Sequence, residues 1–205
     1  MRKNNVNILK IGISGHIGSG KSLAIKFFRS KKYPAYDLDN ISREIMSPGE
    51  KCYKKIIKLF GSDILYKNKN LNRNKIKKII FKDYKIREKY NSIVHPEIFS
   101  KVKEYVKFHV SNKDHIIFFE GALIAKKTKI GKYLDKIILI KSRKDKIIAR
   151  VSKRDGMGTG EIFNILEAQS TTGVNAKDFD YIINNNDKID DFKNKLNSIL
   201  EKISH

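Results

Sequence analysis

Residues 15–22 read GHIGSGKS, and this stretch limits what the chain can fold into more than any other. Gly15, Gly20, Lys21 and Ser22 fill every fixed position of the pattern GxxxxGK[ST], between an apolar run and a helical pattern. Glycines allow successive backbone N–H groups to turn inward around an anion, and the following helix adds its positive N-terminal end. The motif predicts a loop that binds the phosphates of a nucleoside triphosphate with Mg²⁺.

The chemistry of such a loop gives most of its positions a role. Lys21 reaches the outer phosphates, and the Ser22 hydroxyl can ligate Mg²⁺. The backbone of the loop and of the first helical turn surrounds the nucleotide phosphates. The residues expected to bind the nucleoside triphosphate in this way are Gly18, Ser19, Gly20, Lys21, Ser22 and Leu23.

Five short apolar runs are typical of buried strands in a parallel sheet. They are residues 7–14, 34–39, 115–121, 136–141 and 180–185. Helical patterns lie between them, and this alternation predicts an α/β fold with a parallel sheet. Asn72 is expected to cap the N-terminus of one helix, Gly61 to end another, and a further helix is expected over residues 95–110.

The uneven spacing of these runs predicts one core with two excursions. The stretch between the second and third runs reads as helix or loop and is too long for one crossover. We therefore expect a helical insertion over residues 44–112, and a pair of helices with a glycine-rich elbow over residues 142–170. The nucleotide-binding core would comprise residues 7–43, 113–141 and 171–205.

The formal net charge of +22 by itself points to nucleic acid or another polyanion. The lysines are spread almost evenly along the chain, however, and no stripe of basic and aromatic residues stands out. We therefore interpret the charge as a composition bias and expect no specific nucleic-acid partner. A basic surface would favour anionic small substrates.

No apolar run approaches the ~20 residues that a membrane helix needs. The first fifteen residues lack a signal-peptide pattern, and Cys52, the single cysteine, excludes an intrachain disulfide. These observations predict a cytoplasmic protein with no membrane partner, either a monomer or a weak homo-oligomer.

The loop motif alone leaves GTPase, motor ATPase and small-molecule kinase open. A GTPase would carry Asp-x-x-Gly after the third strand, but that run ends FFEGALI. It would also carry Asn-Lys-x-Asp near a later strand, but NNND at 184–187 has Asn185 where lysine belongs. A motor ATPase would need more chain and a strand that ends in Asp-Glu. A small-molecule kinase explains more of the residues.

The stretch YDLDN places Asp37 and Asp39 two residues apart at the end of the second apolar run. On an extended chain such residues point the same way, so both carboxylates would serve an acceptor hydroxyl and the water shell of Mg²⁺. The alternative is a helix N-terminus, where Asp39 or Asn40 caps the helix and acidic residues meet its positive end. The spacing leaves both interpretations open.

Arg150 and Arg154 lie four residues apart on a predicted helix and therefore share one face. Asp155 and the glycine-rich elbow follow them. This arrangement is typical of a mobile lid that brings arginine onto phosphates and excludes water as it closes. The alternative is two solvated arginines on a basic helix.

Taken in order, these motifs resemble those of the dephospho-CoA kinase family over residues 8–187. The resemblance rests on GISGHIGSGKS, YDLDNISREI, LFGSDIL with LNRNKIKKIIF, NSIVHPEI, ARVSKRDG, EAQ and DYIINNND. It implies the three-layer P-loop fold with a five-stranded parallel sheet, a helical substrate-binding insertion for the CoA moiety, and a helical lid.

The resemblance further implies that ATP, with Mg²⁺ as cofactor, phosphorylates the ribose 3′-hydroxyl of dephospho-CoA to give CoA. Asp39 would be the general base and Lys21 would neutralise the transferring phosphoryl group. Asp37 would contact the substrate and, with Ser22, organise Mg²⁺ and its waters. Another nucleotide or small-molecule kinase, or a nucleic-acid-binding P-loop protein, remains as an alternative.

Four further residues receive roles from the resemblance. Arg150 would act in catalysis, Arg154 would bind ATP, and Arg43 and His95 would bind the acceptor. For His95, a capping or packing role before Pro96 is an alternative.

The chain departs from the family pattern in several places. GALI at 121–124 lacks the usual proline, and Glu120 stands where aspartate is common. Asn72 replaces an aspartate, and Asn175 and Asp178 replace basic residues. None of these departures removes Lys21, Ser22 or Asp39.

Overall fold

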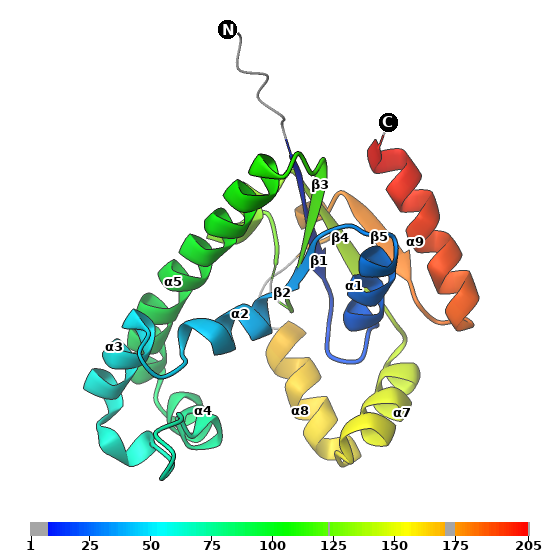
Figure 1. Ribbon diagram of the computed structural model, residues 1–205. Helices are drawn as coiled ribbons and strands as arrows, with labels where there is room; N and C mark the ends of the chain where they lie inside the picture. Colours follow the sequence, from blue (N-terminus) through cyan, green and yellow to red (C-terminus); the bar gives the residue numbers. More distant parts are fainter. Residues whose placement is uncertain (1–7, 123, 171–174, 205) are drawn as a thin grey trace, which may run out of the picture. The chain divides into compact units, whose positions relative to one another are not determined.

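The computed structural model describes residues 8–122, 124–170 and 175–204 (Figure 1). Some of the segments predicted above include residues that the structure does not describe, namely 7, 123, 171–174 and 205. Five strands form one parallel sheet in the order β2-β3-β1-β4-β5. They are β1 (Leu9–Ser14), β2 (Ala35–Asp37), β3 (Ile116–Glu120), β4 (Lys136–Lys141) and β5 (Tyr181–Asn184). The predicted α/β fold with a five-stranded parallel sheet is confirmed.

The strand order places β1 between β3 and β4, with Ile13 paired to Glu120 on one side and to Ile138 on the other. Asp37 of β2 in turn pairs with Glu120. Because all five strands run the same way, their carboxyl ends meet at one edge of the sheet, which is where ligands bind in such folds. The GHIGSGKS loop, Asp37 and Glu120 therefore all lie at this edge.

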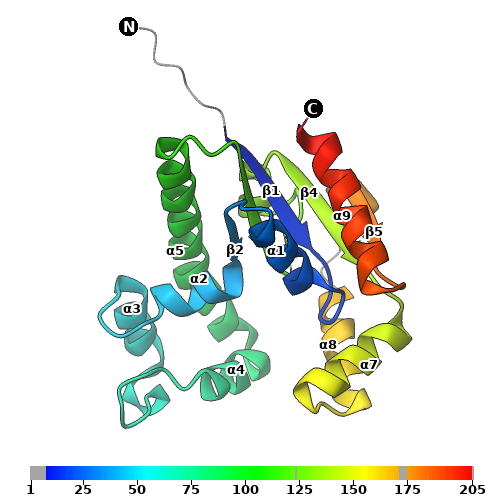
Figure 2. The ribbon, with the colours of Figure 1, turned by 45° about the vertical axis from the view of Figure 1, so that its right-hand side comes forward.

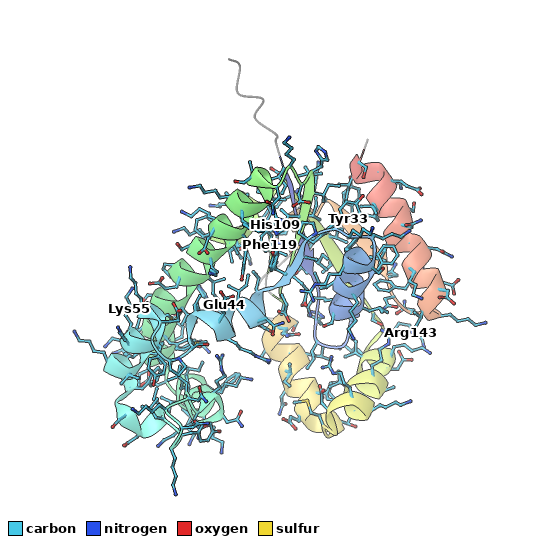
Figure 3. All side chains as sticks on the ribbon, in the orientation of Figure 1. Tyr33, Glu44, Lys55, His109, Phe119 and Arg143 are labelled. Carbon is cyan, nitrogen blue, oxygen red and sulfur yellow. The ribbon has the colours of Figure 1, made fainter. Side chains whose placement is uncertain are left out.

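The sheet is covered on both faces. On one face, α1 (Lys21–Ser30) and α9 (Ile189–Ser204) pack on the buried side chains of the strands, as both views show (Figures 1 and 2). The rings of Phe28 and Phe118 stack there with their centroids 3.8 Å apart. On the other face, the Tyr36 hydroxyl lies 2.6 Å from Nε2 of His109, which with Phe119 is labelled in Figure 3.

Four further helical elements lie between β3 and β5 along the chain. They are α6 (Lys129–Tyr133), α7 (Lys144–Asp155), α8 (Thr159–Ser170) and the short η2 (Ala176–Asp178). Among the described residues, no helix is long and apolar enough to cross a membrane.

The chain divides into two compact units, Met1–Asp37 with Phe108–His205, and Leu38–Lys107. The first, the sheet unit, holds all five strands. The second, the helical unit, is built from α2 (Leu38–Ile45), α3 (Lys51–Phe60), η1 (Ser62–Ile64), α4 (Arg73–Lys82) and most of α5 (Tyr84–Ser111). It begins before the expected residue 44 because α2 starts directly after β2.

Local signals set three helix ends in the helical unit. The Asn72 side chain accepts a hydrogen bond from the Lys75 N–H at 3.0 Å, and Gly61 ends α3 with φ of +80°, as predicted. The helix expected to begin at His95 begins instead at Tyr84, because Asp83 accepts from the Ile86 N–H at 3.0 Å. This helix continues through Pro96.

Candidate active site

The GHIGSGKS loop joins β1 to α1, as the motif predicts. Gly20 is the N-cap residue of α1, with φ of 112° and ψ of 12°. Gly15 and Gly18 also have positive φ, at 152° and 68°. Since side chains are strained in this region, the loop needs glycine at these three positions to form its turn.

The same glycines allow three parts of the sheet unit to approach the loop from behind. A Cβ at Gly15 would collide with the Ile140 carbonyl at the end of β4, and a Cβ at Gly18 would lie 2.7 Å from Cγ2 of Val151 in α7. A Cβ at Gly20 would collide with the Asn185 side-chain amide, which follows β5. The glycines thus serve packing as well as phosphate access.

Lys21 lies across the loop and beside a buried carboxylate. Its Nζ donates to the His16 carbonyl at 3.2 Å and lies 3.6 Å from Oε1 of Glu120. The two side chains are only 11% and 8% exposed. In the sequence, Glu120 stands out only as a departure from the family pattern. The signal that would have found it is an acidic residue that ends a fully buried strand.

Ser22 and Asp37 provide oxygen atoms at the same edge of the sheet. Ser22 is exposed in the first turn of α1, and the half-buried Asp37 ends β2 opposite Glu120. Among the described residues, no group of three or more His, Cys, Asp and Glu could hold a metal by itself. Mg²⁺ usually takes one or two carboxylates together with phosphates and waters, so this oxygen-only set fits it.

Asp39 does not lie on an extended strand, and that part of the prediction is wrong. The strand β2 ends at Asp37, α2 begins at Leu38, and Asp39 occupies the first turn of this helix. The rule that residues i and i+2 point the same way therefore does not apply to the two aspartates. The alternative interpretation is correct in placing an acidic residue at a helix N-terminus, but neither Asp39 nor Asn40 caps α2, because the helix begins before them, at Leu38.

Asp39 lines a cavity of about 420 Å³ within the helical unit. Arg43, Arg73 and Lys77 line the same cavity. Nη2 of Arg73 donates to the Arg43 carbonyl at 3.2 Å, and burial, with a smaller effect of the Arg43 charge, lowers the pKa of Arg73. The remaining lining residues are Ser42, Met46, Asn74, Ile76, Ile80 and Tyr90.

Three cationic side chains line this cavity against one carboxylate, that of Asp39, which leaves an excess of positive charge. Within the described part of the chain, none of the ion pairs involves Arg43, Arg73 or Lys77. Arg73 is half-buried, whereas Arg43 and Lys77 are exposed. Clustered like charges repel each other unless an anion compensates them. The cavity therefore has the electrostatics of an anion-binding site.

The two arginines of α7 lie in different surroundings. Nη1 of Arg150 donates to the Ser142 hydroxyl at 3.0 Å and approaches the Gly18 carbonyl at 3.4 Å, so its guanidinium lies behind the loop. Arg154 is 57% exposed and pairs with Asp155 at 2.6 Å, which raises the pKa of Arg154. Although the two arginines lie four residues apart on one helix, their guanidinium groups have different partners and do not lie together.

His95, expected to bind the acceptor, is exposed on α5 and does not line the cavity of Asp39. Partial desolvation lowers the pKa of His95, with Glu88 acting in the opposite direction. The structure therefore gives His95 no contact that would favour a binding role.

The helices α7 and α8 pack against the loop through Ile17. This side chain contacts a buried apolar cluster formed by Ile147, Val151, Ile162 and Leu166. The Ile17 N–H donates to Oε1 of Gln169 at 3.0 Å. The motif EAQ at 167–169 does not by itself indicate a role for Gln169. His16, which precedes Ile17, is exposed. Partial desolvation lowers the pKa of His16, and the charges of Lys21 and Lys141 lower it further.

Comparison with known proteins gives concordant results. The chain is 32% identical over 198 residues to dephospho-CoA kinase of Fusobacterium nucleatum, covering 97% of this chain and 100% of that protein. It is 30% identical over 194 residues to dephospho-CoA kinase of Oceanobacillus iheyensis, covering 95% and 97%.

Solved structures with less than 25% identity support the fold. The Thermus thermophilus protein TT1252 superposes with a TM-score of 0.77 at 24% identity, covering 96% of this chain and 98% of that chain. The dephospho-CoA kinase from Campylobacter jejuni gives 0.69 at 22% identity, covering 95% and 96%. The family model for dephospho-CoA kinase matches residues 9–191. The chain belongs to the dephospho-CoA kinase family.

Proposed function

We propose that this protein transfers the γ-phosphoryl group of ATP to the ribose 3′-hydroxyl of dephospho-CoA, which completes CoA synthesis. The observation that carries this proposal is the cavity of the helical unit. It combines Asp39, a candidate base, with three cationic side chains, an excess of positive charge that suits an anionic acceptor. Dephospho-CoA has this chemistry, since its ribose carries the acceptor hydroxyl and a diphosphate is attached to the same nucleoside.

In the helical unit, Arg43, Arg73 and Lys77 bind the diphosphate of the acceptor. Asp39 accepts the proton of the 3′-hydroxyl as the phosphoryl group is transferred. A carboxylate suffices for this role, because the transition state of phosphoryl transfer is loose and positioning dominates the rate. His95 lies outside this cavity, and we assign it to the periphery of the acceptor region.

In the sheet unit, the loop backbone binds the ATP phosphates and Lys21 neutralises the charge on the transferring group. P-loop kinases generally use ATP together with Mg²⁺. The Ser22 hydroxyl and the Asp37 carboxylate would hold this ion, with Glu120 behind them. When bound, Mg²⁺ supplies positive charge to the phosphate oxygens.

The lid helices complete the ATP site in this proposal. Arg150 adds positive charge next to the loop, where it already approaches the Gly18 carbonyl. Arg154 exchanges Asp155 for a phosphate oxygen as α7 and α8 close over the nucleotide. We further propose that the protein acts in the cytoplasm as a monomer or weak homo-oligomer, without a specific nucleic-acid partner.

An acceptor panel tests the reaction. ATP turnover is measured with dephospho-CoA, AMP, shikimate and a set of nucleosides. We expect turnover with dephospho-CoA to exceed that with every other acceptor. Turnover with another acceptor and none with dephospho-CoA would replace the proposal with a different small-molecule kinase. A nucleic-acid complex that persists near physiological salt would favour a nucleic-acid-binding role, since charge alone binds loosely there.

Arg73→Ala tests the acceptor cavity. Loss of one charged hydrogen-bond donor is expected to raise KM for dephospho-CoA by about tenfold or more. KM for ATP should stay unchanged. Lys78→Ala is the matched control, because Lys78 is exposed on the same helix and does not line the cavity. Equal KM values for dephospho-CoA in Arg73→Ala and in the unmodified protein would rule the cavity out as the diphosphate site.

A further inference from the structure

The carbonyl oxygens on the outer side of the GHIGSGKS loop need hydrogen-bond partners, because a buried unpaired carbonyl is costly. A trans peptide is planar, so a carbonyl and the N–H of the next residue point in opposite directions. A group that holds the Ser19 carbonyl from behind therefore sets the direction of the Gly20 N–H. This N–H stands at the N-terminus of α1 and has no acceptor among the described residues.

Asn185 is the group that holds the Ser19 carbonyl. Its Nδ2 donates to this oxygen at 2.7 Å, across a separation of 166 residues in the chain. Asn185 is 5% exposed and Ser19 is 1% exposed, so water does not replace this hydrogen bond. The approach is close enough that any side chain at Gly20 would collide with the Asn185 amide.

The backbone of Asn185 is fixed in turn by the neighbouring elements. Its N–H donates to the Lys141 carbonyl at 2.8 Å, which ties it to the end of β4. Its carbonyl accepts from the Ser142 hydroxyl at 2.7 Å and from Nη2 of Arg150 at 3.0 Å. Because Arg150 also approaches the Gly18 carbonyl, Asn185 links the loop to both β4 and α7.

We propose that Asn185 is a positioning residue for nucleotide binding, whose side-chain amide holds the Ser19–Gly20 peptide so that the Gly20 N–H faces the phosphates. This role rests on the proposed ATP site but not on the identity of the acceptor. It also gives a role to the asparagine that follows β5, in the stretch NNND at 184–187.

Three variants test the proposal: Asn185→Ala removes the amide, Asn185→Asp keeps its shape, and Asn184→Ala is the matched control on an exposed neighbour. MgADP binding is measured by calorimetry, and KM for ATP and for dephospho-CoA by turnover. Asn185→Ala is expected to weaken MgADP binding and to raise KM for ATP by about tenfold or more. KM for dephospho-CoA at saturating ATP should change less than about twofold, within the range of surface effects.

A pH series on Asn185→Asp separates positioning from mere packing. An ionised aspartate cannot donate to the Ser19 carbonyl, whereas its protonated form can. Burial raises the pKa of a carboxyl group, whereas the Arg150 guanidinium, whose Nη2 lies 3.5 Å from Oδ1 of Asn185, lowers it, so the series extends to acid pH far enough to protonate this aspartate. We therefore expect MgADP binding by Asn185→Asp to become tighter as pH falls, and to exceed that of Asn185→Ala at low pH.

Several results would overturn the proposal. One is a KM for ATP in Asn185→Ala within twofold of the unmodified protein. Another is an equal rise in both KM values, and a third is an identical pH profile for Asn185→Ala and Asn185→Asp. Loss of the folded state in both variants, followed by circular dichroism, would assign Asn185 to stability alone. Failure of the unmodified protein to phosphorylate dephospho-CoA, with MgADP binding still sensitive to Asn185, would refute the proposed function and leave this inference standing.

Discussion

Lys21→Ala is expected to lower kcat by about 10²–10³-fold. The substitution removes a positive charge that interacts with the phosphoryl group most strongly in the transition state. The side chain already lies across the loop, where its Nζ donates to the His16 carbonyl. Steady-state turnover of ATP and dephospho-CoA at saturating concentrations measures the effect. Lys26→Ala is the matched control, since Lys26 is exposed on the same helix.

Lys21→Ala also leaves Glu120 buried without the nearby ammonium group, which is expected to lower the melting temperature. The double variant Lys21→Ala with Glu120→Gln removes this buried charge. It should recover stability without recovering turnover. An unchanged rate in folded Lys21→Ala would contradict the assignment of this loop to phosphoryl transfer.

Asp39→Asn is expected to lower kcat by about 10²–10⁴-fold, the usual contribution of a positioned general base. The fold should survive, because Asp39 is exposed and its interaction with the helix dipole contributes only about 0.3–1 kcal/mol. Turnover at saturating substrates and circular dichroism measure the two effects. KM for ATP should remain close to that of the unmodified protein.

Asn40→Ala is the matched control for Asp39→Asn, since Asn40 is exposed on the same helical turn and has no proposed role. Near-normal turnover in Asp39→Asn would move the base to another residue. Asp37 would then be the next candidate, since it ends the strand that precedes α2.

Signals that depend on a few adjacent residues predict local structure correctly in this chain. The Asn72 cap, the Gly61 helix end and the strand–loop–helix around GHIGSGKS each depend on a few adjacent residues, and all three are confirmed. The pairing of Asp37 with Asp39 failed because a strand of only three residues gives way to a helix between them. An extended pattern and the first turn of a helix look alike over five residues.

The cavity of the helical unit also depends on contacts that no local sequence signal predicts. The sequence indicated a substrate-binding role for Arg43 but could not distinguish Arg73 and Lys77 from the many other basic residues. Only folding places these three side chains around one cavity, where they outnumber the single carboxylate, that of Asp39.

The sequence by itself determined the phosphate loop, because glycine torsion angles and the positive end of a helix are properties of adjacent residues. It also determined the fold class, through the alternation of short apolar runs with helical patterns. The tertiary structure alone decided what holds the loop from behind. Gln169 and Asn185 reach it across 152 and 166 residues of sequence. Their contacts depend on β4 and β5 following β1 in the sheet, and no local pattern encodes that order.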